Sequence, residues 1–143
     1  MGYLEKKLQA IISTLDAWKI MTGTLATCTA SSSGADVYGA STAIGKNVKI
    51  ATVYITLTYT WGGTGDTSYG CRMEGYNIDT SAWETVGEIG GVVTRPTTKT
   101  LSGTVSNTHT DSVYSHIRVY VYGGLYCTSR SGSGSIKSWY EQG

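Results

Sequence analysis

The sequence predicts an all-β protein, a two-sheet antiparallel sandwich of about eight strands that is preceded by one N-terminal amphipathic helix. Residues 3–20 carry apolar side chains at helical spacing, whereas the rest of the chain consists of short alternating runs of Thr, Ser, Gly, Tyr and Val. Ser, Thr and Gly make up about two-fifths of the chain, which also has 11 Tyr and no Phe. Because Thr, Val and Tyr suit a pleated surface, these runs indicate strands.

The change of pattern near residue 22 divides the chain into two parts. Residues 1–21 are expected to form an oligomerisation helix, and residues 22–143 are expected to form the β-sandwich head. The 143 residues are enough for one globular domain with a sizeable core. With a net charge of +1, the sequence gives no electrostatic reason to expect a nucleic-acid partner or a membrane partner.

The sequence also lacks the usual targeting segments. No apolar run approaches the 18–20 residues that a bilayer-spanning helix requires. Charged residues, among them Glu5, Lys6 and Lys7, interrupt the apolar positions near the N-terminus, so no signal peptide is expected. An exported protein of this kind must leave by another route, or act in a particle that is assembled in the cytoplasm.

The helix carries an apolar seam whose members are spaced by four and three residues: Leu4, Leu8, Ile11, Leu15 and Trp18. This is the a/d spacing of a coiled coil, with Ile12 widening the stripe. Two interpretations remain open. The seam packs on the sheet of its own domain, or it forms a short coiled coil between chains. A coiled coil this short needs support from contacts between the heads, because an isolated helix of this length is marginal in water.

The expected strands follow in order along the head: 37–43, 48–61, 69–78, 83–89, 98–106, 115–122 and 136–140. In the clearest of them, alternation predicts that Val53, Ile55 and Leu57 face inward, and a bulge near residues 51–52 reconciles them with Val48 and Ile50. Residues 31–34 and 129–135 are expected to be Gly/Ser loops, and Gly90-Gly91 is expected to end a strand.

Four segments of the head resemble discoidin-like and carbohydrate-binding-module-like jelly-roll domains. They are residues 73–87 (MEGYNIDTSAWETVG), 100–106 (TLSGTVS), 115–123 (SHIRVYVYG) and 134–140 (GSIKSWY). The resemblance covers about residues 45–140 and implies a jelly-roll sandwich without specifying a ligand. A helix before such a head also resembles trimeric phage or virus surface proteins, namely head fibres, decoration proteins and tail-fibre tips.

No catalytic constellation stands out, and the protein is predicted not to be an enzyme and to need no cofactor. His109, Asp111 and Ser112 lie in one polar loop, whereas the members of a catalytic triad converge from separate segments. No metal-binding motif is present, although Asp66 or Asp79 could contribute to a loop Ca²⁺ site. The three cysteines are expected to be buried thiols, with a Cys28–Cys127 disulfide as the alternative. These three cysteines lack the spacing of a zinc site.

The aromatic side chains are the remaining ligand candidates. Tyr54, Tyr120 and Tyr122 lie opposite to the apolar positions of their strands and could stack on sugar rings, or could simply stabilise the sheet. Trp61 and Trp83 are expected to pack in the core. The first functional hypothesis is a structural or adhesive protein of a virus-like particle, located on a virion or an extracellular surface. Its expected partners are copies of itself, in a trimer, together with other particle proteins or surface glycans. The alternative is a carbohydrate-binding module that binds glycans through exposed Tyr and Trp.

Overall fold

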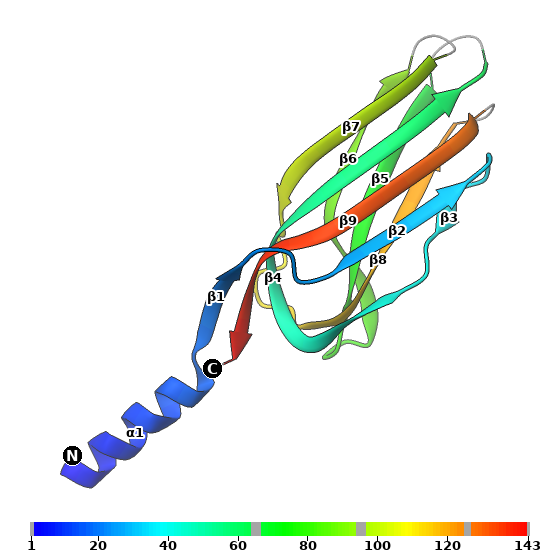
Figure 1. Ribbon diagram of the computed structural model, residues 1–143. Helices are drawn as coiled ribbons and strands as arrows, with labels where there is room; N and C mark the ends of the chain where they lie inside the picture. The colour runs from blue at the N-terminus through cyan, green and yellow to red at the C-terminus, as the bar shows by residue number, and fades with distance from the viewer. Residues whose placement is uncertain (1, 64–66, 94–96, 125–126, 143) are drawn as a thin grey trace.

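The computed structural model describes residues 2–63, 67–93, 97–124 and 127–142, and it leaves the side chains of residues 10–16 and 93 undescribed. One helix is followed by a β-sandwich, and the helix projects from one end of it (Figure 1). Within the described residues, the elements are α1 (Tyr3–Asp16), β1 (Trp18–Thr22), β2 (Thr27–Ser32), β3 (Val37–Tyr38), β4 (Thr42–Trp61), β5 (Thr67–Asn77), β6 (Ala82–Val93), β7 (Thr97–Ser106), β8 (Tyr114–Gly123) and β9 (Cys127–Gln142).

The strand order identifies the sandwich as a jelly roll. One sheet, here called the β9 sheet, has the order β2–β9–β4–β7, with β1 also pairing with β9. The other, called the β8 sheet, has the order β3–β8–β5–β6. The first residues of β4 pair with β8, so this long strand bends from one sheet into the other. All pairings are antiparallel, and two interlocking four-strand sets of this order are the double Greek key of a jelly roll.

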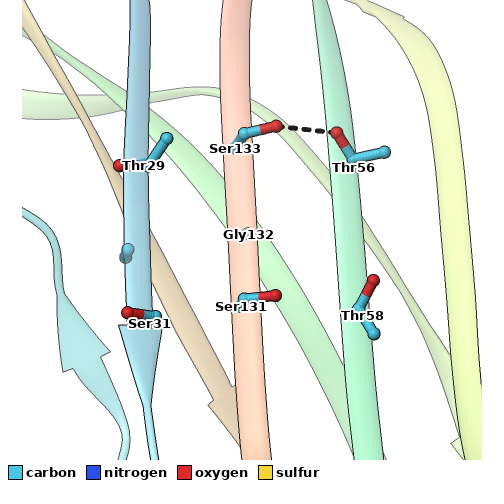
Figure 2. Close-up of a pocket in the computed structure, with 8 residues that line it drawn as sticks. Thr29, Ser31, Thr56, Thr58, Ser131, Gly132 and Ser133 are labelled. Carbon is cyan, nitrogen blue, oxygen red and sulfur yellow. Dashed lines mark hydrogen bonds between the residues drawn. The ribbon is translucent and has the colours of Figure 1, made fainter.

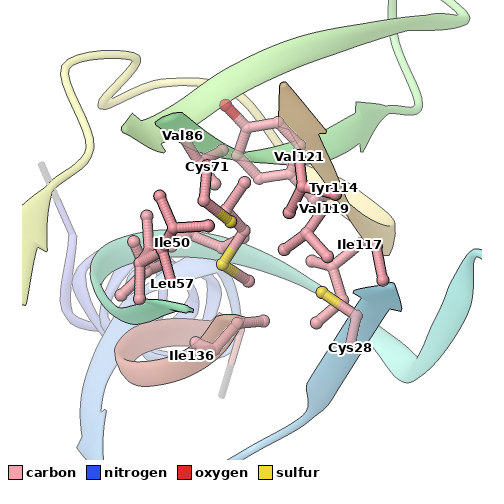
Figure 3. Packing of buried hydrophobic residues seen from close by; sticks show 14 of the residues in the cluster. Cys28, Ile50, Leu57, Cys71, Val86, Tyr114, Ile117, Val119, Val121 and Ile136 are labelled. Carbon is pink, nitrogen blue, oxygen red and sulfur yellow. The ribbon is translucent and has the colours of Figure 1, made fainter. Parts of the chain in front are cut away.

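The core lies between the two sheets and follows the predicted alternation. Val53, Ile55 and Leu57 of β4 are fully buried, as are Ile117, Val119 and Val121 of β8. Figure 3 shows side chains of this core, contributed by both sheets, packed together. The pairing of β4 with β9 shifts register between Ile50 and Val53, which confirms the predicted bulge. All three cysteine thiols are free and buried, so the prediction of buried thiols is confirmed and the disulfide alternative is wrong.

The helix is shorter than the predicted span of 3–20. It ends at Asp16, and Ala17 has extended backbone angles, with φ −67° and ψ 133°. Trp18 therefore belongs to β1 and lies opposite Gln142 of β9. Strand pairing supplies backbone hydrogen bonds that a frayed last helical turn lacks, which accounts for the early end. The predicted boundary after residue 21 consequently falls inside β1.

The predicted loop at residues 129–135 is wrong, because β9 runs without interruption from Cys127 to Gln142. The glycines in this stretch face the core rather than solvent. A Cβ atom at Gly132 would lie 2.7 Å from Cys71 Sγ, and one at Gly134 would lie 2.6 Å from Met73 Sδ. Glycine is needed here because strand β5 of the opposite sheet approaches closely.

Two other predictions about strands also fail for reasons of packing. The loop predicted at 31–34 begins later than expected, because Ser31 and Ser32 belong to β2, in which Cys28 and Ala30 fill the core beside β9. Gly90 and Gly91 do not end β6, which continues to Val93 and pairs with Gly70 and Tyr69 of β5. Trp61 is buried as predicted, whereas Trp83 is only half-buried and lies on the outer face of the β8 sheet.

Candidate functional site: an aromatic–arginine face

The outer face of the β8 sheet carries five aromatic side chains that are exposed or half-buried: Tyr38, Tyr76, Trp83, Tyr120 and Tyr122. Its rows are set by strand pairing, which places Tyr38 opposite Tyr120, Tyr120 opposite Arg72, and Arg118 opposite Glu74. We call this surface the aromatic–arginine face, and define it by Tyr38, Arg72, Glu74, Tyr76, Trp83, His116, Arg118, Tyr120 and Tyr122. Alternation along β8 brings its outward residues here, while the intervening residues fill the core.

Three tyrosine rings form a stack at one end of this face. The ring centroids of Tyr38 and Tyr120 are 4.3 Å apart, and those of Tyr120 and Tyr122 are 5.5 Å apart. Partial burial, and after it the nearby Asp36 carboxylate, raise the pKa of Tyr120. The tyrosine stack therefore offers flat apolar rings with hydroxyl groups at their edges.

Arg118 continues the face beyond the tyrosine stack. Its guanidinium carbon lies 4.2 Å from the centroid of the Tyr38 ring and 4.1 Å from that of Trp83. The planar cation thus lies against two rings and is held there by cation–π attraction. Arg72 contributes in the same way, at 5.0 Å from the Tyr120 ring.

Glu74 is the counter-charge for both arginines. Its Oε1 accepts a hydrogen bond from Arg118 Nε at 2.7 Å, and its Oε2 accepts one from Arg72 Nε at 3.1 Å. The residue is only 6% exposed, because the two long side chains cover it. A buried carboxylate that bridges two guanidinium groups fixes their orientation.

A second ion pair fixes the edge of the face near β3. Arg130 of β9 is 2% exposed; its Nη1 pairs with Asp36, and its Nη2 donates to the Gly34 carbonyl at 2.7 Å. Asp36 in turn accepts hydrogen bonds from the Gly123 amide at 3.1 Å and from the Tyr120 hydroxyl at 3.4 Å. The segment before β3 is therefore fastened to both sheets, which holds Tyr38 against Tyr120.

The sequence-predicted ligand residues are divided by the structure between the two outer faces. Tyr120 and Tyr122 lie together on the aromatic–arginine face. Tyr54, which is 38% exposed, belongs to the part of β4 in the β9 sheet and lies opposite Thr104 and Ser135. Sequence reasoning missed the roles of Tyr38, Arg72, Glu74 and Arg118. Of these, Arg118 was detectable, since it alternates with Tyr120 and Tyr122 along one strand.

The outer face of the β9 sheet has a different chemistry, because it consists mainly of hydroxyl groups. Five cross-strand hydroxyl pairs lie 2.6–3.1 Å apart: Thr27–Ser135, Thr52–Ser138, Thr56–Ser133, Thr58–Thr100 and Thr60–Thr98. A shallow depression of about 280 Å³ lies over β9 between Thr29 and Thr56 (Figure 2). The bonded hydroxyls form a neutral polar surface without aromatic rings in that depression.

Polar residues at the end of the β8 sheet near the 107–113 loop form a separate cluster. Glu84 accepts hydrogen bonds from Asn77 Nδ2 at 2.9 Å and from Ser112 Oγ at 3.4 Å, and His109 Nδ1 lies 3.7 Å from Glu84 Oε2. Partial burial acts to raise the pKa of Glu84, but the bonds from Ser112 and Asn77, with His109, outweigh it and lower the pKa. The cluster ties the loop to the sheet.

Metal binding receives no support from the described residues, in which no group of three His, Cys, Asp or Glu side chains is close enough to hold an ion. Asp66, considered as a Ca²⁺ ligand, lies outside the described residues, and Asp79 is exposed in the turn after β5. In the described part of the chain, no helix is long and apolar enough to cross a membrane.

The structure also separates the residues of the predicted helix seam, because they do not all lie in α1. Leu4 and Leu8 are 79% and 58% exposed. Ile11 and Leu15 lie in α1, but their side chains are outside the described residues. Trp18 belongs to β1 rather than to the helix, and the centroid of its ring lies 4.6 Å from the ammonium nitrogen of Lys49. The apolar surface continues into β1, where Ile20 and Met21 are exposed.

No protein-family model and no curated protein matches this chain. Among solved structures, it is similar to chains of infectious bursal disease virus; that of the Gx strain is 17% identical with a TM-score of 0.46, over 90% of this chain and 34% of that one. A CBM32 of AlyQ in complex with 4,5-unsaturated mannuronic acid is 15% identical with a TM-score of 0.37, over 80% of this chain and 78% of that one. Eiger TNF from S. frugiperda is 12% identical with a TM-score of 0.44, over 84% of this chain and 92% of that one.

The chain spans about a third of the length of the bursal disease virus chains. The class of protein is defined by its own topology, a jelly-roll sandwich with an aromatic–arginine face and a projecting N-terminal helix.

Proposed function

We propose that this chain is a non-enzymatic structural or adhesive protein of a virus-like particle, of the decoration, head-fibre or fibre-tip type, and that α1 joins its heads into a homotrimer. The observation that carries the proposal is the helix itself. α1 projects from the sandwich (Figure 1). The side chains of Leu4 and Leu8 on it are exposed to solvent. Large apolar side chains gathered on one exposed element indicate an interaction surface.

Self-association explains why such a helix would be stable. A helix of 14 residues is marginal in water by itself, and most helical stability in proteins comes from packing an apolar stripe. Leu8 and Leu15 occupy a positions of the seam, whereas Leu4 and Ile11 occupy d positions. Leu at a with a β-branched residue at d favours assemblies larger than the dimer. Without Trp18 the seam spans less than the sequence predicted, so β1 and the heads must add contacts.

The experiment that tests this function is the native mass of the full chain by light scattering. A trimer has three times the chain mass of 15.2 kDa. A monomer at micromolar concentration would contradict the proposal.

Glycan binding is the second candidate, and the arrangement of Tyr38, Tyr120 and Tyr122 favours it. Flat aromatic rings beside oriented polar groups suit sugar rings, which present apolar C–H faces and hydroxyl edges. Arg72, Arg118 and Glu74 are already oriented by one another, so they lose little freedom on binding a ligand. Replacing Tyr120 and Tyr122 by Ala is expected to abolish signals on a glycan array, while Tyr54→Ala on the opposite sheet leaves them unchanged.

A further inference from the structure

One concave corner of the aromatic–arginine face has the features of a small binding pocket. It is an open depression of about 240 Å³, lined by Ser41, Tyr76, Trp83 and His116. Three of these residues form a single cross-strand row, since Tyr76 pairs with Trp83 of β6 on one side and with His116 of β8 on the other. Ser41, in the segment just before β4, completes the lining.

We propose that this corner, here called the Trp83 pocket, binds a single uncharged sugar ring. The inference rests on the glycan-binding candidate above and adds to the tyrosine stack a subsite for one ring, with its chemical class. The rings of Tyr76 and Trp83 meet at 68° with centroids 5.4 Å apart, so they form two walls of a corner rather than a flat platform. One sugar face can lie on one wall while the ring edge meets the other.

Polar groups that can bind sugar hydroxyls lie between these walls. His116 Nδ1 is 2.8 Å from the hydroxyl of Ser115, and this contact leaves Nε2 as the ring nitrogen for a ligand. The hydroxyl of Ser41 is the second polar group in the lining. Apolar walls with a few convergent hydrogen-bonding groups are the usual composition of a small-molecule site.

The charges around the pocket favour an uncharged ligand. None of the four lining residues is an acid, a lysine or an arginine. The nearest guanidinium, that of Arg118, lies on the Trp83 ring and is paired with Glu74 at 2.7 Å. An anionic sugar would be desolvated without a new counter-charge, which costs free energy. The lining comes from one cross-strand row of three side chains and Ser41 beside it, a footprint that suits one ring rather than a longer segment.

The test is a titration of the full chain with methyl glycosides of neutral hexoses and N-acetylhexosamines, alongside glucuronic acid and a sulfated hexose. Binding is followed by tryptophan fluorescence and by the indole N–H signals in NMR. A neutral sugar is expected to shift the Trp83 indole signal, identified by its absence in Trp83→Phe. His116→Ala and the pocket-filling Ser41→Trp are each expected to weaken binding at least tenfold, and Tyr54→Ala is the matched control on the other sheet.

Each other outcome overturns a defined part of the account. Unchanged affinity in both pocket variants, with binding lost in Tyr120→Ala/Tyr122→Ala, would place the ligand on the tyrosine stack and refute the pocket while preserving the glycan function. Preference for glucuronic acid or the sulfated sugar would refute the uncharged class. No binding of any sugar by the parent protein, in titration or on an array, would refute both. Because Ser41 is exposed, Ser41→Trp tests the pocket without altering the core.

Discussion

Glu74 accepts a hydrogen bond from Arg118 at 2.7 Å, and this contact holds the guanidinium of Arg118 against the rings of Tyr38 and Trp83. We expect Glu74→Gln to lower the free energy of unfolding by about 1–2 kcal/mol, because the two hydrogen bonds from Arg72 and Arg118 lose their charged acceptor. The change is measured as the shift in the urea midpoint. Asp111→Asn, at an exposed position in the 107–113 loop, is the control. A variant as stable as the parent would show that the ion pairs are only surface contacts.

The glycines of β9 should be intolerant of any side chain. We expect Gly132→Ala to destabilise the protein by about 1–3 kcal/mol, because the added methyl group overlaps Cys71 Sγ and Val121 Cγ1, each 2.7 Å from its position. Gly103→Ala is the matched control, since it lies in a strand with open space around the added atom, and it should be neutral or slightly stabilising. Thermal unfolding measures both. Equal effects of the two changes would contradict the observed packing of β9.

The packing of the β9 glycines also shows which parts of the fold could be predicted from the sequence. Alternation along 53–61 and 115–122 correctly assigned inward and outward residues, because large apolar side chains mark the buried face. The stretch 129–135 looked like a loop because glycine and serine are typical of turns. These residues form a strand here, and its glycines leave room for Cys71 and Met73 of the facing sheet. The residues of one strand give no sign of such a neighbour.

The candidate site was predictable to a similar extent. Tyr120 and Tyr122 alternate with buried valines along one strand, so their shared face follows from the sequence. Tyr54 satisfies the same rule along β4, but the rule does not say which sheet a strand joins. Its separation from the other two follows only from the pairing of β4 with β9 and β7. The contact of Arg118 with Tyr38 likewise depends on the pairing of β3 with β8.

Stability should depend on acid pH through Glu84. Its pKa in the folded protein lies below the usual value for glutamate, about 4.3, so its contribution is present in full above that value. The contribution is lost as the pH falls through the folded-state pKa. Glu84→Gln is therefore expected to lower the melting temperature at pH 7, and the gap from the parent should narrow below about pH 4. Glu5→Gln on α1 serves as the control. A gap that is independent of pH would contradict this role of Glu84.

Two of the three thiols should be unreactive toward thiol reagents while the protein is folded. Burial, above all, raises the pKa of Cys28 and of Cys71 to about 12. Almost no thiolate is then present at pH 8, and the thiolate is the reactive form. We expect a thiol reagent to label neither residue until urea is added, as read by mass spectrometry of digested protein. Rapid labelling of both residues in the absence of urea would show that the core opens readily.

The exposed surface of β1 should contribute to assembly together with α1. Ile20 and Met21 follow the helix directly and are exposed beside the end of β9. We expect Ile20→Lys to weaken the assembly at least tenfold in a sedimentation dilution series, because it would place a charge in the junction between chains. Lys19→Gln is the control at the neighbouring position. A dilution curve unchanged by Ile20→Lys would confine the contacts to the helix.

The most direct test of the central claim, that α1 joins the heads, is the mass of a charge variant of the helix seam. Leu4→Glu/Leu8→Glu would introduce six carboxylates into a trimer seam, whereas Glu5→Gln/Gln9→Glu keeps the charge of the helix and leaves the seam intact. By size-exclusion chromatography with light scattering, the parent and the control should have three times the 15.2 kDa chain mass, and the seam variant should be a monomer with an unchanged β-type circular dichroism spectrum. An identical mass for the parent and the seam variant would contradict the claim.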